Sequence, residues 1–346
     1  MTPLLSIHCL TYNHAPFIRQ TLDGFVMQKT NFPFEVLIHD DASTDGTADI
    51  IREYEAKYPD IIKPIYQTEN QWNKGVSISK KYQFPRIKGK YVALCEGDDY
   101  WTDPLKLQKQ VDFLESHPDC SICFHPVVVH WEDKSKPDSI YPTEKQLKGI
   151  KEFDLHELLN QNFIQTNSVV YRWRFHQDNL DLIPEKILPG DWFLHLLHAQ
   201  VGKIVFLPEV MATYRRHQGG IWTGAGQEDG WFIKCGIPHI KFYKAVEKQF
   251  NVNKQSEIEN MFVDILAAAI NQKNNVFFQD VIDNNKNIWN KISASKFCSF
   301  QKWLFLIISK IPFLPQKKKI KHKLKQVSKI VMIKNNMKTL SEVPDK

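Results

Sequence analysis

Apolar segments of strand length alternate with segments of helical periodicity over the first hundred residues, and this order restricts the possible folds. Strands are predicted at 4–10, 34–39, 61–67 and 91–96, where apolar and β-branched residues dominate. Helical spacing of apolar residues follows the first two strands, and the basic segment 73–88 is also predicted to be helical. A β–α–β–α order favours a parallel sheet, because parallel neighbours need crossover connections. The sequence therefore predicts an α/β fold with helices on both faces of the sheet.

Further elements are predicted downstream from the same periodicities. They are helices from Pro16 and from Asp191 and at 104–116, 227–250 and 257–270, strands at 120–130 and 162–171, a loop at 132–150, and a hairpin-like pair of strands at 203–207 and 210–214.

Polar loops follow three of the predicted strands, at 11–14, 40–45 and 96–99. In sheets of this kind, ligands bind beyond the carboxyl ends of the strands. The chain contains no Gly-x-Gly-x-x-Gly and no Walker sequence, which disfavours a dinucleotide site and a P-loop phosphate site. Carboxylates and hydroxyls are therefore expected to face the ligand.

The loop at 96–99 reads Glu96-Gly97-Asp98-Asp99. Adjacent carboxylates repel each other, and a bound cation would offset that repulsion. Carboxylate oxygens suit Mg²⁺ or Mn²⁺, and such an ion would also bridge an acidic pocket to a phosphate-bearing ligand. The alternative is a solvated acidic loop before the helix that Asp103-Pro104 opens.

Four segments, in this order, resemble glycosyltransferase family 2, the inverting GT-A group, over roughly residues 4–222. They are Thr11-Tyr12-Asn13, Asp40-Asp41-Ala42-Ser43-Thr44-Asp45-Gly46-Thr47, Glu96-Gly97-Asp98-Asp99 and Gly190-Asp191-Trp192. The resemblance implies a GT-A fold, with a mixed, mostly parallel sheet. It also implies a nucleotide-diphosphate-sugar donor, a divalent metal, and transfer with inversion at the anomeric carbon.

The resemblance also implies roles for single residues. Thr11, Tyr12 and Asn13 are assigned to the nucleotide pocket, Asp41 to a hydrogen bond from the base, and Asp98 and Asp99 to the metal and the diphosphate. A carboxylate at Asp41 matches the imide N–H of a base such as uracil, which favours a UDP-sugar. Many relatives carry Asp at the position of Glu96, so its contact, with metal or with ribose, stays open. Asp40 is expected to brace its turn and Asp45 to cap the next helix.

An inverting transfer needs one base that takes the proton of the acceptor hydroxyl. Asp191 is the candidate by its position in the family motif, and the alternative is a plain helix cap. The basic, glycine-rich loop 215–222 is predicted to close over the diphosphate, with Arg216 on a phosphate and His217 as a metal ligand or a donor to the leaving phosphate. Its alternative is a surface loop. The polar residues 165–168 are predicted to form the floor of the acceptor site.

The charge of the chain is unevenly distributed. Its formal net charge is +6, but residues 284–340 hold 14 lysines and no Asp, Glu or Arg, which leaves 30 basic and 37 acidic residues in 1–283. We therefore predict a catalytic domain at 1–225 that does not bind nucleic acid, and a helical, basic extension at 226–346. Aromatic and aliphatic residues beside lysines at 302–315 suit an anchor on an anionic membrane surface, and the alternative is a core helix with a lysine-rich end.

The function predicted from these features is addition of one sugar to a glycan or lipid-linked acceptor in cell-surface polysaccharide synthesis. The start of the chain lacks the basic and apolar regions of a signal peptide, and no apolar stretch reaches membrane-spanning length. We therefore expect a cytoplasmic protein, peripheral on the inner face of the plasma membrane. Two alternatives stay open: a nucleotidyltransferase that makes the sugar nucleotide, and a non-catalytic scaffold that binds it.

Overall fold

The computed structural model describes residues 2–147, 149–176, 179–222 and 228–294. The chain divides into two compact units, Met1–Ala268 and Ala269–Lys346. The predicted domain boundary at 225/226 falls among residues outside the described ranges and stays a prediction. The predicted membrane anchor at 302–315 also lies outside them. Of the helices that the structure describes, none has the length and apolar character needed to cross a membrane.

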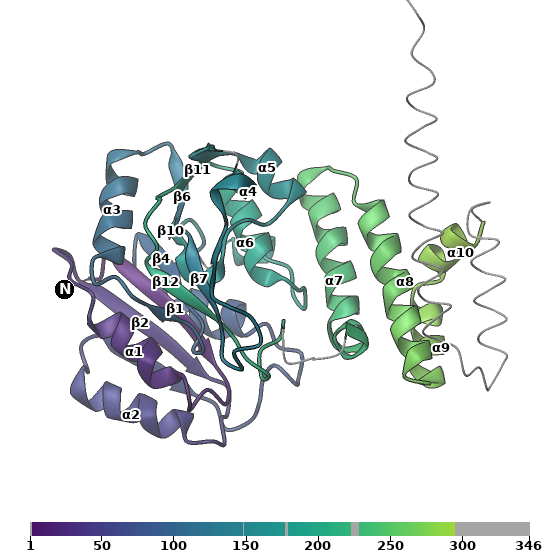
Figure 1. The fold of residues 1–346 in the computed structure, drawn as a ribbon, viewed down its shortest axis with the longest axis horizontal. Helices are drawn as coiled ribbons and strands as arrows, with labels where there is room; N and C mark the ends of the chain where they lie inside the picture. The colour runs from purple at the N-terminus through teal and green to yellow at the C-terminus, as the bar shows by residue number, and fades with distance from the viewer. Residues whose placement is uncertain (1, 148, 177–178, 223–227, 295–346) are drawn as a thin grey trace, which may run out of the picture. The chain divides into compact units, whose positions relative to one another are not determined.

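The centre of the first unit is an eight-stranded sheet with the order β3-β2-β1-β4-β10-β6-β11-β9 (Figure 1). Its strands are β1 Leu5–Thr11, β2 Phe34–Asp40, β3 Ile62–Tyr66, β4 Tyr91–Leu94, β6 Cys120–Phe124, β9 Glu152–Phe153, β10 Val170–Arg172 and β11 Lys203–Phe206. Strands β3, β2, β1 and β4 are parallel to one another, as are β6 and β11, whereas β10 runs antiparallel to β4 and β6, and β9 runs antiparallel to β11. The predicted mixed, mostly parallel sheet is confirmed.

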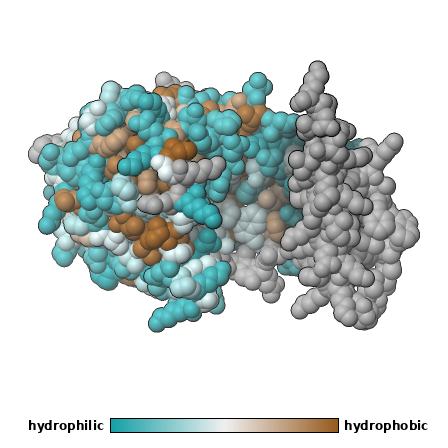
Figure 2. Space-filling view, turned by 45° about the horizontal axis from the view of Figure 1, so that its top comes forward, coloured by the Kyte–Doolittle hydropathy of each residue, from teal (hydrophilic) through white to brown (hydrophobic). Residues whose placement is uncertain are grey.

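Helices cover both faces of this sheet (Figure 1). Within the first unit they are α1 Ile18–Val26, α2 Thr47–Lys57, α3 Lys106–Ser116, α4 Glu144–Leu147, α5 Leu155–Asn160, α6 Gly190–Ala199, α7 Glu228–Phe250 and the greater part of α8 Gln255–Asn271; α9 Asn275–Asn284 and α10 Lys286–Ala294 belong to the second unit. Alternation along β4 shows why two cores form: Tyr91 and Ala93 pack with α1, α2 and α3, while Val92 and Leu94 pack with α5, α6 and α7. Apolar side chains thus pack on both sides of the large sheet. The face of the molecule in Figure 2 is mostly hydrophilic.

A second, four-stranded sheet has the order β5-β12-β7-β8. Its strands are β5 Tyr100–Trp101, β7 Val127–Trp131, β8 Ser139–Tyr141 and β12 Ala212–Arg216. Strand β12 is parallel to β7 and antiparallel to β5, which follows the acidic loop directly. The pairing of β12 with β5 therefore places β12 beside the loop after β4.

Two predicted elements differ because the chain changes sheets. The expected strand 120–130 breaks at His125-Pro126 into β6 and β7, since Pro126 has no N–H to continue the ladder. The expected hairpin of 203–207 and 210–214 does not form. Strand β11 pairs with β6 and β9 in the large sheet, whereas β12 pairs in the small one.

Three other predictions were wrong in secondary structure. The segment 73–88 contains only a short π-helix at Ser79–Gln83 and a 3-10 turn at Phe84–Arg86, interrupted by Pro85. The expected strand 162–171 contains a 3-10 turn at Thr166–Ser168 before β10. The expected loop 132–150 contains β8 and α4. The helices predicted at 104–116, 227–250 and 257–270 are confirmed.

Lys106 gives the fold a specific pH dependence. Its ammonium is fully buried, 2.8 Å from Gln110 Oε1 and 4.2 Å from the centroid of the Trp101 ring. Burial lowers the pKa of Lys106 from 10.5 to about 7. Between these values the unfolded chain binds one proton more than the folded chain, so this group makes the free energy of unfolding rise with pH, by up to about 1.4 kcal/mol per unit. Below pH 7 the burial of the charged Lys106 ammonium lowers the free energy of unfolding by its full amount.

We therefore expect Lys106→Met to be most stabilising, relative to the unchanged protein, at pH 6 to 7, and the difference to shrink towards pH 10. Urea denaturation of both proteins at several pH values measures this difference. If the difference in the free energy of unfolding did not vary with pH, the pKa of Lys106 would not be lowered in the folded protein.

Candidate active site

Three loops meet at the carboxyl ends of β2, β1 and β4, which are neighbours in the large sheet. Thr11 at the end of β1 lies opposite Asp40 of β2, and the amide of Gly97 donates to Leu10 O at 2.8 Å. A Cβ atom at Gly97 would lie 2.7 Å from Thr11 Oγ1, so only glycine fits this close approach. The polar loops predicted at 11–14, 40–45 and 96–99 are therefore brought together.

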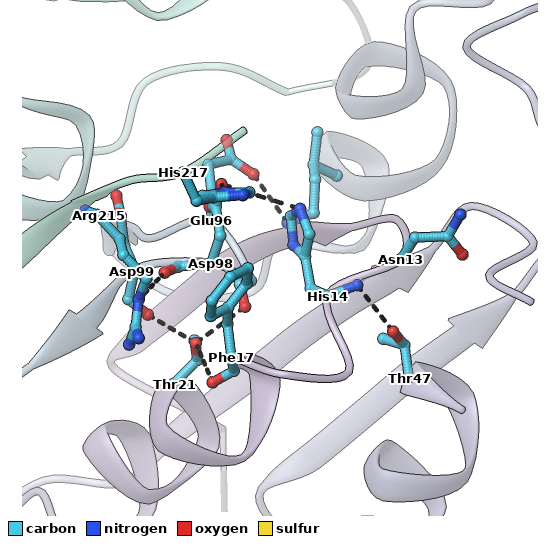
Figure 3. Close-up of polar contacts among 12 residues, drawn as sticks. Asn13, His14, Phe17, Thr21, Thr47, Glu96, Asp98, Asp99, Arg215 and His217 are labelled. Carbon is cyan, nitrogen blue, oxygen red and sulfur yellow. Dashed lines mark hydrogen bonds and ion pairs between the residues drawn. The ribbon is translucent and has the colours of Figure 1, made fainter. Parts of the chain in front are cut away.

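Asp98 lies between two histidines (Figure 3). Its Oδ2 atom is 3.0 Å from His217 Nε2 and 3.8 Å from His14 Nε2. The ring of Phe17 packs on His217, with centroids 4.5 Å apart. Burial opposes ionisation of Asp98, but the hydrogen bond with His217 and the nearby charges of His14 and His217 together outweigh it and lower the pKa of this carboxyl. The structure thus joins two predicted metal ligands that are 119 residues apart and adds His14, which the sequence analysis did not select.

Asp99 points elsewhere. Its Oδ1 atom accepts a hydrogen bond from the Arg215 amide at 2.8 Å, and its side chain is buried. Burial and the adjacent Asp98 raise the pKa of Asp99 well above its usual value. Asp99 is not part of the group formed by Asp98 and the two histidines. Its predicted role as a metal ligand stays a prediction, while its observed contact is with the backbone of β12.

Arg215 fixes the acidic loop from the other side. Its guanidinium donates to the Asp98 carbonyl, to Glu132 Oε1 and to Gln20 Oε1, at 2.8, 2.7 and 2.7 Å. It also stacks between aromatic rings, those of Phe17 and Tyr100. A guanidinium that is held by three hydrogen bonds and two aromatic rings positions the groups around it. Sequence reasoning missed this role because all of these partners are distant along the chain.

Glu96 is next to the same group. Its Oε2 atom accepts from the Leu10 amide at 3.2 Å. Burial, with smaller contributions from Asp98 and Asp191, raises the pKa of Glu96 to about 8. Asp98 raises the pKa of both Glu96 and Asp99, so the three carboxyl groups form a site with a deficit of positive charge, which a divalent cation would supply. The contact of Glu96 with metal or ribose stays a prediction.

The residues predicted for the nucleotide line the adjoining loops. Asp41 is buried, and its two oxygens accept hydrogen bonds from the amides of Gln71 and Trp72 at 2.7 and 3.0 Å. Thr11 is buried, and its hydroxyl has no hydrogen-bond partner in the described structure. Tyr12 is 43% exposed. A buried hydroxyl without a partner beside a braced carboxylate is an arrangement that a polar ligand can complete.

Asn13, Asp40 and Asp45 hold the shape of these loops. Asn13 has a positive φ of 54°, donates its amide to Ser43 Oγ at 2.8 Å, and accepts from the Thr44 amide through Oδ1 at 2.9 Å. Asp40 accepts from the Ser43 amide at 3.2 Å, as expected of a turn brace. Asp45 accepts from the amides of Ala15 and of Thr47, the first residue of α2, but the N-cap position of α2 is Gly46, so Asp45 precedes the cap that the sequence predicted for it. Asn13 therefore contacts the neighbouring loop, and its nucleotide role stays a prediction.

Asp191 lies at the start of α6. Its Oδ2 atom accepts from the Thr166 hydroxyl at 2.6 Å, and its Oδ1 atom accepts from the Trp192 amide at 2.8 Å. The turn Thr166–Ser168 is held in turn by Asn167, whose side chain donates to Thr213 O and whose carbonyl accepts from Trp101 Nε1. The polar segment 165–168 thus reaches the candidate base, although as a turn and not as a strand.

Arg216 follows Arg215 at the end of β12. Its guanidinium lies over the rings of Trp131 and Tyr214, with 5.6 and 5.0 Å to the centroids, and its Nε atom is buried without a hydrogen-bond partner in the described structure. A cation with a donor still available suits an anionic group of a ligand. Its predicted phosphate contact stays a prediction.

The group formed by His14, Asp98 and His217 is suited to a metal ion by the chemistry of its donors. The three ligand atoms lie within 4.8 Å of one another. Burial lowers the pKa of His14, which favours the neutral imidazole that metals bind. One carboxylate and two imidazoles form a mixed oxygen and nitrogen set of the kind that divalent transition metals accept.

A mostly parallel α/β sheet, with acidic loops at the carboxyl ends of its strands and a second small sheet, is the architecture of the GT-A glycosyltransferases. Comparison with known sequences agrees, since the sequence model of glycosyl transferase family 2 matches residues 6–174. The chain is 34% identical over 249 residues to TuaG of Bacillus subtilis, named a putative teichuronic acid biosynthesis glycosyltransferase; the match covers 70% of this chain and 92% of TuaG. The chain therefore belongs to glycosyl transferase family 2.

Two other relatives match a smaller share of their own length. Rv1520 of Mycobacterium tuberculosis, an uncharacterized protein, is 51% identical over 221 residues, which is 64% of this chain and 61% of that protein, less than two thirds. WfaP of Escherichia coli is 33% identical over 113 residues, 33% of this chain and 42% of WfaP. Its name is UDP-Glc:alpha-D-GlcNAc-diphosphoundecaprenol beta-1,3-glucosyltransferase.

Proposed function

We propose that the chain is a metal-dependent, inverting glycosyltransferase that moves one sugar from a UDP-sugar to a lipid-linked glycan in cell-surface polysaccharide synthesis. The observation that carries this proposal is the 3.0 Å contact between Asp98 and His217 where the loop after β4 meets the end of β12. The name of TuaG refers to teichuronic acid biosynthesis, and that of WfaP to a UDP-sugar donor and a lipid diphosphate acceptor. The name of WfaP supports this donor and acceptor class, and that of TuaG supports a role in polysaccharide synthesis.

Asp98 and His217 would hold Mn²⁺ or Mg²⁺, which supplies positive charge to the diphosphate when bound. On the donor side, Asp41 accepts a hydrogen bond from the base, and Thr11 supplies its buried hydroxyl to the nucleoside. Arg216 lies beside the diphosphate and stabilises the charge that develops as it leaves. Family membership disfavours the nucleotidyltransferase alternative.

Asp191 takes the proton of the acceptor hydroxyl. The hydrogen bonds from Thr166 and from the Trp192 amide fix its carboxylate, so no reorientation is needed at the moment of attack. The hydroxyl oxygen attacks the anomeric carbon from the face opposite the nucleotide diphosphate, and the bond to the diphosphate breaks, which inverts the configuration.

The C-terminal sequence places the enzyme near its acceptor in this proposal. Apolar segments at 303–308 and 311–315 are followed by a lysine-rich segment at 317–325, a composition that suits the anionic inner face of the plasma membrane. A cytoplasmic, peripheral location would give access to both a soluble donor and a lipid-linked acceptor. Cosedimentation of the full chain with anionic and with neutral vesicles measures this association.

The proposal predicts that UDP-sugars stabilise the protein only when a divalent metal is present. At a free ligand concentration of 100 times Kd, binding adds about 2.7 kcal/mol to the free energy of unfolding. A thermal-shift series with UDP-glucose, UDP-N-acetylglucosamine and GDP-mannose, each with Mn²⁺ and each with a chelator, measures this effect. Equal shifts with metal and with chelator would contradict the metal dependence, and a preference for GDP-mannose would contradict the choice of base.

A further inference from the structure

We infer that His14 is a metal ligand together with Asp98 and His217, and that this His–Asp–His set selects Mn²⁺ or another divalent transition metal over Mg²⁺. The inference deepens the proposed function, since it assumes that the site holds a metal, and it adds a residue and a preference that the sequence motifs do not assign.

The separations between the donor atoms fit one ion. With metal–ligand bonds of about 2.1 Å, two ligand atoms at a right angle lie roughly 3.0 Å apart, and two opposite ones roughly 4.2 Å apart. Asp98 Oδ2 is 3.0 Å from His217 Nε2 and 3.8 Å from His14 Nε2, so both separations fall in this range. The two imidazole rings are perpendicular, at 88°, with centroids 6.1 Å apart. Two rings can therefore approach one ion without stacking against each other.

The backbone holds His14 in place before any ion binds. The His14 amide donates to Thr47 Oγ1 at 2.8 Å, and its carbonyl accepts from the amides of Phe17 and Ile18, both at 2.8 Å. The positive φ of Asn13 turns the chain immediately before it. Figure 3 shows the imidazole of His14 directed at Asp98 and His217. A ligand fixed by its own loop loses little conformational entropy on binding.

The surroundings of His14 favour a ligand over an ion pair. Its side chain is only 16% exposed, and its Nδ1 atom is buried without a hydrogen-bond partner in the described structure. At 3.8 Å, Nε2 is too far from Asp98 for a hydrogen bond. A buried imidazole whose Nε2 atom makes no hydrogen bond with the nearby carboxylate can offer that nitrogen to a metal ion.

The chemical type of the ligand atoms determines which metal the site prefers. Mg²⁺ prefers oxygen ligands and usually keeps several waters, whereas imidazole nitrogens suit transition metals. A site with one carboxylate and two imidazoles is therefore a poor match for Mg²⁺. Asp99 supplies no second carboxylate in this arrangement, because its Oδ1 atom accepts from the Arg215 amide.

Electron spin-echo spectroscopy of Mn²⁺ bound to the full chain, without any nucleotide, tests the inference. We expect couplings to two histidine nitrogens in the unchanged protein and to one in His14→Gln. The Kd for Mn²⁺ is expected to rise at least tenfold in His14→Gln, and its ratio to the Kd for Mg²⁺ to move towards unity. His156→Gln, an exposed histidine of α5, is the matched control and should change neither quantity.

Two nitrogen couplings or an unchanged Mn²⁺ affinity in His14→Gln would overturn the inference, as would equal affinities for Mn²⁺ and Mg²⁺ in the unchanged protein. Circular dichroism shows whether each variant is folded. His217→Gln adds a second test, since it should also leave one coupling. The proposed function fails separately, when no UDP-sugar is transferred although Mn²⁺ is bound through two nitrogens.

Discussion

Replacing Asp191 with Asn is expected to lower the rate of sugar transfer by about 10²- to 10⁴-fold, while the donor binds as before. Asn keeps the size of the side chain, its Oδ1 atom can still accept from the Trp192 amide, and its Nδ2 atom can donate to the Thr166 hydroxyl, so the start of α6 should stay intact. The amide cannot take a proton from the acceptor hydroxyl. Because that proton is transferred only during reaction, the loss should fall on kcat and leave the Kd of the donor unchanged.

Product formation from a UDP-sugar and a lipid diphosphate acceptor measures this change, and calorimetry measures donor binding. Asp112→Asn makes the same substitution at an exposed position of α3 and should keep full activity. If Asp191 were only a helix cap, Asp191→Asn would lower the melting temperature slightly and leave kcat within a few-fold. That result would remove Asp191 as the base.

The parts of the site that follow strand ends were predictable from sequence. Buried parallel strands bring their carboxyl ends to one edge of a sheet, so the loops after β1, β2 and β4 had to meet. The joining of Asp98 and His217 agreed with a metal role assigned from the family motif and the basic loop. The meeting of the three loops depends only on strand order, whereas the metal role depends on the family motif and stays a prediction.

The orientation of Asp99 could not be predicted from the sequence. Both residues of the Asp98-Asp99 pair lie beyond the end of β4, with Asp98 in a turn, so the alternation of side chains along a strand does not set their directions. In the structure Asp98 lies beside His14 and His217, and Asp99 accepts from the Arg215 amide.

Other features depend on tertiary contacts that no local pattern encodes. His14 is a single histidine in a turn, and its meaning appears only when β12 brings His217 beside it. The place of β12 itself depends on Pro126, which ends β6 and lets β7 begin a second sheet. A continuous apolar run across that proline looks like one strand, because periodicity alone does not show which sheet a strand enters.

Asp98→Asn is expected to reduce transfer by about 10³-fold and to remove the effect of Mn²⁺ on donor binding. Loss of the charge removes the strongest ligand, and a metal that stabilises developing charge contributes several kcal/mol, each 1.4 kcal/mol being tenfold in rate. Asn still accepts the hydrogen bond with His217, so the loop after β4 should keep its shape. We therefore expect Asp98→Asn to lower only the transfer rate and the donor affinity that depend on the metal.

Calorimetry of UDP-sugar binding with Mn²⁺ and with a chelator separates this defect from misfolding. In the unchanged protein the two affinities should differ, whereas in Asp98→Asn both should equal the weak affinity measured with chelator. Asp112→Asn is again the matched control and should behave like the unchanged protein. Asp98→Asn is expected to stay folded. Asp98 raises the pKa of both Glu96 and Asp99, so removing its charge relieves the repulsion among these carboxyl groups. A variant that still binds donor more tightly with Mn²⁺ would show that Asp98 is not a metal ligand, and that the acidic loop acts without an ion.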